Sequence, residues 1–176
     1  MTTVTVTARP RRSDPGFAAL AVKPPSARES QVLRLMSYGL GNRQIARTLR
    51  VSDHTVKTFV SRMLAKFEAA NRAALIANGF ARGVLAPRPL HPGVIAPPID
   101  GHLAVVLLRI AQGKTNREIA AELGIEEHRA VRGLLGFLGV TGRDGAVRIG
   151  VEAGYLAPSP DGSRLVLAPP VAGGAL

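Results

Sequence analysis

The feature that most constrains this chain is an internal repeat. The segment "GLGNRQIARTLRVSDH", residues 39–54, returns as "GKTNREIAAELGIEEH", residues 113–128, at a constant offset of 74 residues. Six residues recur, namely Asn42, Arg43, Ile45, Ala46, Leu49 and His54, which return as Asn116, Arg117, Ile119, Ala120, Leu123 and His128. A repeat of this kind is typical of one structural unit written twice, so we expect two copies of one fold.

The offset falls to 71 residues further along the chain. The segment "RGVLAPRP", residues 82–89, is echoed by "AGYLAPSP", residues 153–160. The second copy has therefore lost about one helical turn between Arg129 and Thr141. The connectors "LAVKPP", "GVIAPP" and "LVLAPP" are rich in proline and glycine, which exclude helix and favour turns with short edge strands. The pair Asp161 and Gly162 lies between two apolar stretches and predicts a hairpin there.

These patterns divide the chain into five parts. They are an N-terminal arm (1–25), a first helical domain (26–86), a proline-rich linker (87–98), a second, degenerate domain (99–157) and a C-terminal hairpin or tail (158–176). The density of prolines makes the linker a fairly stiff spacer, which restricts the placement of one copy relative to the other.

Four short helices are predicted in the first copy. Their bounds are 26–39, opened by a capping box of Ser26 and Glu29; 42–50, capped by Asn42; 53–67, capped by Asp53; and 71–82. The third carries a single apolar stripe, Val56, Val60, Met63 and Phe67, at helical spacing. Because a tight turn joins the second and third helices, we predict a helix-turn-helix domain in a mainly α fold.

Composition favours a nucleic-acid partner. The 176 residues carry 23 basic and 12 acidic side chains, a formal charge of +11, and so basic a protein commonly meets a polyanion. Aromatic residues are few, which disfavours base stacking on single strands and leaves duplex DNA as the expected partner. The absence of cysteine, of a signal-peptide pattern and of a long apolar run predicts a cytoplasmic, nucleoid-associated protein that does not enter membranes.

The outer face of the predicted third helix is small and polar. His54, Thr58, Ser61 and Ala65 lie opposite the apolar stripe, and Lys57 flanks it. A helix that enters the major groove must present such a face to the base edges, since acids there would repel phosphate. An ordinary solvated helix face stays open as the alternative.

Residues 26–85 resemble the DNA-binding domain of LuxR-type transcriptional regulators, the family that includes GerE and the NarL-like response regulators. The resemblance rests on Glu29 before "VLRLM", on "GLGNRQIA", on "VSDHTVK" and on the closing "GVL". It implies that Lys57, Thr58 and Ser61 face the bases. The residues expected to contact phosphates are Asn42, Arg43, His54, Thr55 and Arg62. Residues 99–156 resemble the same family more loosely.

The second copy departs from this pattern in its third helix. At the 74-residue offset, Lys57, Thr58 and Ser61 become Val131, Arg132 and Leu135, while a shift by one residue would align "TVK" with 130–132. Residues 26–86 hold ten Lys or Arg against three Asp or Glu, a net of +7, whereas residues 99–157 hold seven of each. Glu126 and Glu127 also lie at the start of the predicted helix, and glycines at 133, 136 and 139 weaken it by roughly 0.5–1 kcal/mol each.

We therefore expect the second copy to keep the fold but to serve protein association. The expected association surface consists of Val131, Leu135 and Leu138. Regulators of the resembling family pair through their fourth helix, so we expect either a homodimer or an internal pair of the two copies.

Three other patterns were weighed. The "GKT" at 113–115 lacks the upstream glycine of a phosphate-binding loop, and the four histidines show no metal-ligand spacing. No nucleophile and base form a recognisable set, so neither an enzyme nor a cofactor is expected. The segment "ARPRR", with Arg9, Arg11 and Arg12, is either an arm that enters the minor groove or a solvated tail.

The leading hypothesis is a sequence-specific regulator of transcription that binds double-stranded DNA through the helix at 53–67, without an attached sensor domain. One alternative is an adaptor that binds RNA polymerase or another regulator through these folds. Another is an architectural protein that binds duplex DNA with little sequence preference.

Overall fold

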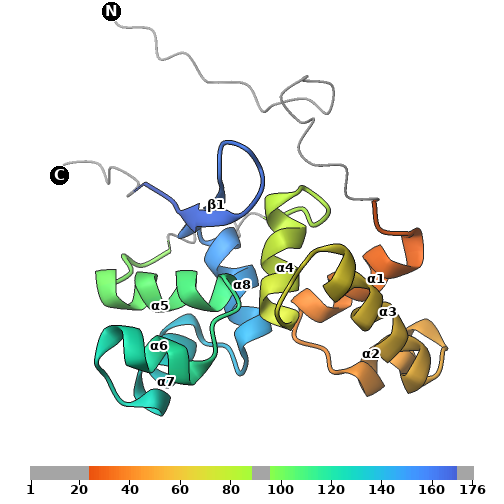
Figure 1. Cartoon of the computed structure of the whole chain (residues 1–176), viewed down its shortest axis with the longest axis horizontal. Coiled ribbons are helices and arrows are strands. Elements are labelled where there is room, and N and C mark those ends of the chain that lie inside the picture. Colours follow the sequence, from red (N-terminus) through yellow and green to blue (C-terminus); the bar gives the residue numbers. More distant parts are fainter. Residues whose placement is uncertain (1–23, 89–95, 170–176) are drawn as a thin grey trace, which may run out of the picture.

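A computed structural model describes residues 24–88 and 96–169, apart from the side chains of Glu127 and His128. Within these residues the chain forms eight helices and one two-stranded hairpin (Figure 1). Their bounds are α1 (Ala27–Ser37), α2 (Asn42–Leu49), α3 (Asp53–Lys66), α4 (Arg72–Ala81), α5 (Gly101–Ala111), α6 (Asn116–Leu123), α7 (Glu127–Leu138), α8 (Arg143–Glu152), β1 (Leu156–Pro158) and β2 (Leu165–Leu167). The predicted mainly α fold is confirmed. The arginines of the predicted arm, Arg9, Arg11 and Arg12, lie outside the described residues.

The caps of the first helices agree with the sequence at two ends and differ at two others. Ser26 and Glu29 form the predicted capping box of α1, and the Asn71 side chain accepts the Ala74 N–H at the start of α4. The structure corrects the other two caps by one residue. The extended cap of α2 is Gly41, whose N–H is bound by the Gln44 side chain at 2.8 Å.

The cap of α3 is Ser52, not the predicted Asp53. Its hydroxyl accepts the Thr55 N–H at 3.0 Å, and its backbone has the extended conformation of a cap. Asp53 is the first helical residue, where its negative charge still favours the positive end of the helix dipole.

The order and spacing of the first four helices recur in the last four. The starts of α1, α2 and α3 lie 74 residues before those of α5, α6 and α7, whereas α4 starts 71 residues before α8. The missing length is accounted for by α7, which has 12 residues against 14 in α3, and by the turn that follows. We call α1–α4 the first half and α5–α8, with the hairpin, the second half.

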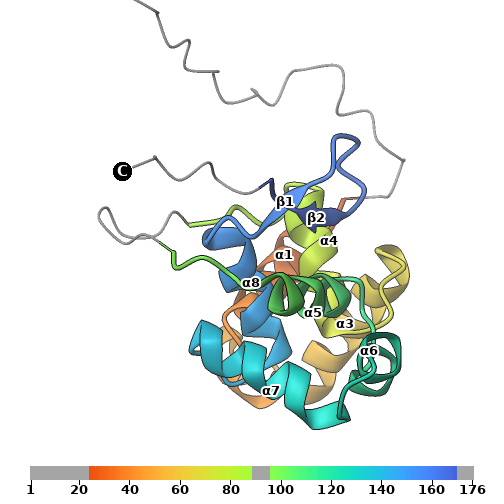
Figure 2. The ribbon, with the colours of Figure 1, turned by 90° about the vertical axis from the view of Figure 1, so that its left-hand side faces the viewer.

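The two halves pack directly against each other. In Figure 1, α4 and α8 stand side by side at the centre, and α4 also contacts α5 while α1 contacts α8. Figure 2 shows α5 and α8 in front of the first half. One continuous apolar core runs through both halves. The expected pair of copies is therefore joined by a large buried contact and not by the linker alone.

Helix α4 is buried on nearly all sides because it lies between the core of its own half and the second half. Eight of its ten residues are buried: Ala73, Ala74, Leu75, Ile76, Ala77, Gly79, Phe80 and Ala81. Small side chains allow the close approach. A Cβ built on Gly113, which has a φ of +84°, would lie 3.0 Å from the Cβ of Ala74.

The predicted hairpin is present. β1 and β2 pair antiparallel with Leu156 opposite Leu167, and the buried Leu156 and Leu165 pack the hairpin on the core next to α4 and α5. In the connecting loop Asp161 accepts bonds from Ser159 and Ser163, which lower the pKa of its carboxyl to about 2. None of the described helices has the length and apolar composition of a membrane span.

Candidate nucleic-acid interface

Helix α3 has one buried face and one exposed face, as its sequence predicts. Val56, Met63 and Phe67 are at most 1% exposed, and Val60 is 8% exposed, so the apolar stripe is the inner face. The exposed side chains of the outer face are His54, Lys57, Ser61, Arg62 and Ala65, with Thr58 half-buried among them. The structure thus brings the three predicted base-reading residues together on one accessible surface.

The side chains of this face are held in place by local bonds. The Lys57 ammonium lies 3.1 Å from the Asp53 carboxylate, and the Lys57 side chain is 64% exposed. The Thr58 hydroxyl donates to the His54 carbonyl at 3.0 Å and keeps its lone pairs free to accept. An exposed ion pair of this kind contributes at most about 1 kcal/mol, so Lys57 can exchange its partner for a stronger acceptor.

The predicted phosphate-contacting residues lie around the starts of α2 and α3. Arg43 and Arg62 are exposed, and the Thr55 hydroxyl shares a hydrogen bond with that of Ser52 at 2.8 Å. Asn42 has a second role that its sequence did not indicate. Its side-chain oxygen accepts a bond from Arg72 of α4 at 2.8 Å, which leaves its amide protons for other acceptors.

An arginine at the start of the fourth helix locks the helix-turn-helix unit in both halves. Arg72 also donates to the Leu40 carbonyl at 3.0 Å, and its counterpart Arg143 donates to Asn116 at 3.1 Å and to the Lys114 carbonyl. Sequence reasoning missed this pair. The signal was present, since Arg72 recurs as Arg143 at the offset of 71 while Asn42 recurs at 74.

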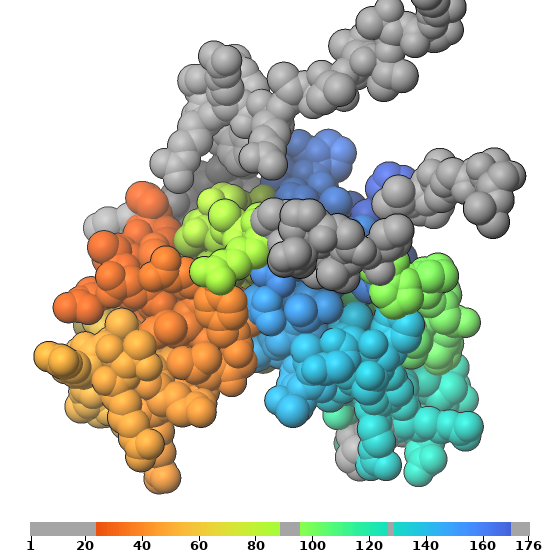
Figure 3. All heavy atoms as spheres, turned by 180° about the vertical axis from the view of Figure 1, so that it is seen from behind, coloured from red at the N-terminus to blue at the C-terminus, as the bar shows by residue number. Residues whose placement is uncertain are grey.

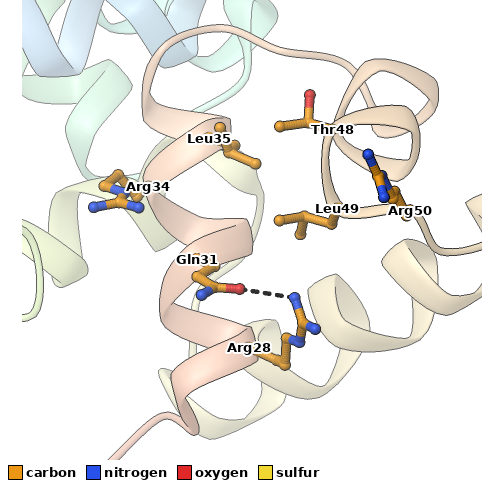
Figure 4. Close-up of a pocket in the computed structure, with 7 residues that line it drawn as sticks. All are labelled: Arg28, Gln31, Arg34, Leu35, Thr48, Leu49 and Arg50. Carbon is orange, nitrogen blue, oxygen red and sulfur yellow. Dashed lines mark hydrogen bonds between the residues drawn. The ribbon is translucent and has the colours of Figure 1, made fainter.

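The accessible charge of the first half is predominantly positive. Its acid Glu29 is buried against Lys66 at 2.7 Å; burial opposes ionisation, but the bonds from Lys66 and Ser26 hold the pKa of this carboxyl below its usual value. The exposed basic side chains of α1–α3 and their turns are Arg28, Arg34, Arg43, Arg47, Arg50, Lys57 and Arg62. Figure 4 shows Arg28 and Arg50 on either side of a groove of about 290 Å³ between α1 and the end of α2.

Helix α7 presents a different face from the one expected. Ala130, Val131 and Leu134 are at most 6% exposed and form its inner face, while Leu135 and Leu138 are half-buried against the core. The predicted association surface is therefore wrong for Val131 and is largely turned inward for the two leucines. The inner face of α7 includes the position matching Lys57, because the loss of residues after Leu138 lets the helix pack in a rotated setting.

The outer face of α7 is formed by exposed Arg129, Arg132, Gly133 and Gly136. Phe137 is also 37% exposed, and its ring centroid lies 6.4 Å from that of Tyr155. Glu126 is exposed at the cap position of the helix, and the side chain of Glu127 lies outside the described part.

Acids of the second half are neutralised by neighbouring bases. Glu122 lies 2.6 Å from Arg109 and 3.2 Å from Lys114, and bonds from Thr115 lower the pKa of Glu118. The segment 113–115 is the turn before α6, with Thr115 as its cap. Among the described residues, no three His, Asp or Glu side chains gather as a metal site.

The comparisons with known proteins concern the first half. Residues 24–78 match the family model described as bacterial regulatory proteins, luxR family, so α1–α3 and most of α4 lie in a LuxR-family helix-turn-helix domain. Two relatives from Bacillus subtilis (strain 168) are described as uncharacterized transcriptional regulatory proteins. YxjL is 41% identical over 63 residues, which are 36% of this chain and 29% of YxjL. YhcZ is 50% identical over 52 residues, 28% of this chain and 24% of YhcZ.

The chain therefore spans less than a third of the length of these curated relatives. No solved structure matches the chain. The second half lies outside the residues that the family model matches.

Proposed function

We propose that this protein is a sequence-specific regulator of transcription that binds double-stranded DNA and reads the major groove with α3. The observation that carries the proposal is the outer face of α3: exposed, small and polar, with Lys57 at its edge, on a helix whose opposite face is fixed in the core. An α-helix fits the major groove, and donors and acceptors on such a face match the base edges.

In this proposal Lys57, Thr58 and Ser61 read the bases. Arg43, His54, Thr55, Arg62 and the amide of Asn42 contact the phosphates and fix the orientation of α3. The bonds from Arg72 to Asn42 and to the Leu40 carbonyl support this division, since they hold the start of α2 relative to α4 before DNA binds. The names of the two relatives, both transcriptional regulatory proteins, agree with a role in transcription.

We further infer that one chain acts as an internal pair. The support is the burial of α4, whose free side is covered by α8 and α5, so that a second chain has no access to that surface. Seen from behind in Figure 3, the lower part of the molecule forms two lobes separated by a notch, one from the first half and one from the second. Two lobes on one side suit contacts at two places along a duplex.

The second lobe, in this account, contacts phosphates and reads few bases. Arg129 and Arg132 on the outer face of α7 supply charge, and Gly133 and Gly136 leave room for a close approach. Glu126 at the start of α7 limits how deeply that end can enter a groove, because an acid near phosphates is unfavourable.

The experiment that tests the function is genome-wide footprinting with the purified full-length chain. A defined set of sites sharing one motif is the expected result. Uniform protection would indicate an architectural DNA-binding protein instead. No protection at all would favour the adaptor, which binds RNA polymerase or another regulator and not DNA.

A further inference from the structure

A polar cavity lies where α1 of the first half meets α8 of the second. Its volume is about 510 Å³, and its walls come from α1, the end of α4, residues 84–88 and the last two turns of α8. Cavities of this size accommodate small organic molecules. The cavity lies away from the outer face of α3, so the DNA contacts proposed above do not use it.

The cavity carries an excess of positive charge. Three arginines line it, Arg34, Arg88 and Arg148, against one carboxylate, Glu152. The Glu152 side chain is 7% exposed and is already engaged by the Arg148 guanidinium at 2.5 Å and by the Arg88 backbone N–H at 3.4 Å. Within the described residues neither Arg34 nor Arg88 forms an ion pair, so two guanidinium charges face the cavity without a matching anion.

The arginines are positioned by a shared aromatic ring. The guanidinium carbons of Arg88 and Arg148 lie 5.4 and 5.1 Å from the centre of the Tyr38 ring. The buried Nε of Arg148 has no hydrogen-bond partner in the described part of the chain. Two cations held beside one ring, one of them with an unused donor, form an arrangement that an additional anion would stabilise.

The cavity also has an apolar wall. Phe80, Val84 and Leu85 line it beside the arginines. A site that combines an apolar wall with several fixed cationic donors matches a ligand that has an apolar body and an anionic head group.

The equivalent junction on the other side of the molecule is built differently. Seventy-one residues before Arg148 and Glu152 stand Ala77 and Ala81, which are 2% exposed and lie where α4 packs next to α5. The α5 residues that match Arg34 and Tyr38 are Leu108 and Gln112. The charged lining is thus a property of the α1–α8 junction and does not follow from repeating the fold.

We propose that this cavity binds a small organic anion, with a carboxylate or phosphoryl group on Arg34, Arg88 and Arg148 and an apolar body against Phe80 and Val84. Because the walls belong to both halves, the bound ligand connects α1 to α8 and stabilises their contact. The anion is defined by this shared chemistry, and the two head groups are distinguished by experiment.

The test uses the full-length chain with benzoate and phenyl phosphate as probes and neutral benzamide as the control ligand. At millimolar concentrations we expect at least one of the two anions to raise the melting temperature in a dose-dependent manner, with no effect of benzamide. In NMR spectra the bound anion should show contacts to the Phe80 ring or the Val84 methyl groups.

The matched variants separate the cavity from general surface charge. The double variant Arg34→Gln, Arg88→Gln should weaken binding of the anion about tenfold or more, as expected for lost charge-assisted hydrogen bonds. Arg28→Gln removes a charge from the same helix but lies outside the cavity, and it should bind the probe as the wild type does. Circular dichroism without ligand checks that the variants fold.

Three results would overturn the proposal. They are the absence of binding of both anions to the folded wild type, equal binding by the double variant, and complete displacement of the probe by a short DNA duplex. The last result would place these arginines in the DNA-binding surface.

Discussion

Helices α3 and α7 start at matching positions of the repeat, yet they bury different faces. In α3 the position of Lys57 is exposed, and its matching position in α7 is Val131, which is 5% exposed. The outer face of α3 carries Thr58 and Ser61, which can both donate and accept, whereas that of α7 carries two arginines and two glycines. The difference teaches that a repeated fold can keep its core spacing while one copy loses the side chains that read bases.

The largest expected effect concerns the packing that the halves share. Gly79 of α4 faces Leu33 and Leu85, and Gly150 of α8 faces Leu107 and Leu156; a Cβ added at these glycines would lie 3.0 and 2.8 Å from the nearest leucine carbon. We expect Gly79→Val and Gly150→Val each to lower the free energy of unfolding by about 3 kcal/mol through overpacking.

Urea denaturation followed by circular dichroism measures this effect. Because one core runs through both halves, each variant should unfold the whole chain in a single transition with a lowered midpoint. Two separate transitions, only one of which responds to a given variant, would break the account of a shared core.

The next effect distinguishes Arg72 from Arg143. Both bind the start of the second helix in their own half, but Arg72 also forms an ion pair with Asp144 of the other half at 2.9 Å. We expect Arg72→Ala to cost about 2 kcal/mol and Arg143→Ala about 1 kcal/mol, since only the first leaves a carboxylate without its partner. Chemical denaturation gives both values, and a larger loss for Arg143→Ala would contradict the role of the pair that joins the halves.

The comparison of α3 with α7 predicts two kinds of DNA-binding defect. Lys57→Ala should lower the affinity for the preferred site by about 1–2 kcal/mol and relax base preference, as expected for a groove contact. Arg132→Ala should weaken binding to all sequences by a smaller amount and reduce the salt dependence by about one phosphate contact. Fluorescence anisotropy at several salt concentrations, with specific and scrambled duplexes, measures both; unchanged preference in Lys57→Ala would remove it from the reading set.

The smallest effect concerns the turn after α2. Arg50 has a left-handed φ of 54°, while the matching residue after α6 is Gly124 with a φ of 64°. Arg50→Gly should therefore raise the free energy of unfolding by a few tenths of a kcal/mol to about 1 kcal/mol, since glycine adopts this conformation without steric cost. The measurement is again the denaturation midpoint, with Gly124→Ala as the reverse control, which should be destabilised.

The elements of the fold were largely predictable from the sequence, because they depend on local signals. The stripe from Val56 to Phe67, the capping box of Ser26 and Glu29, and the turn at Asp161 and Gly162 each involve residues close in sequence. The caps of α2 and α3 differed by one residue, since Ser52 and Asp53 are both good caps and the backbone conformation decides between them.

The tertiary features were not predictable in the same way. The inward setting of Val131 depends on how α7 packs after the three-residue loss, which a pattern of glycines and leucines does not specify. The bonds of Arg72 join residues 30 and 72 positions apart, and the cavity beside Tyr38 is formed by helices from both halves. Such contacts depend on the arrangement of the whole chain. The roles of Lys57, Thr58 and Ser61 toward DNA stay predictions.

The central claim is that a single chain presents two helix-turn-helix units to one DNA site, with α4 covered by its own second half. Sedimentation velocity of the full-length chain with a duplex containing a footprinted site measures the number of chains per duplex directly. The account predicts a monomer in the absence of DNA and one chain per site at saturation. Two chains per site, or a free dimer that dissociates when α4 is altered, would contradict it.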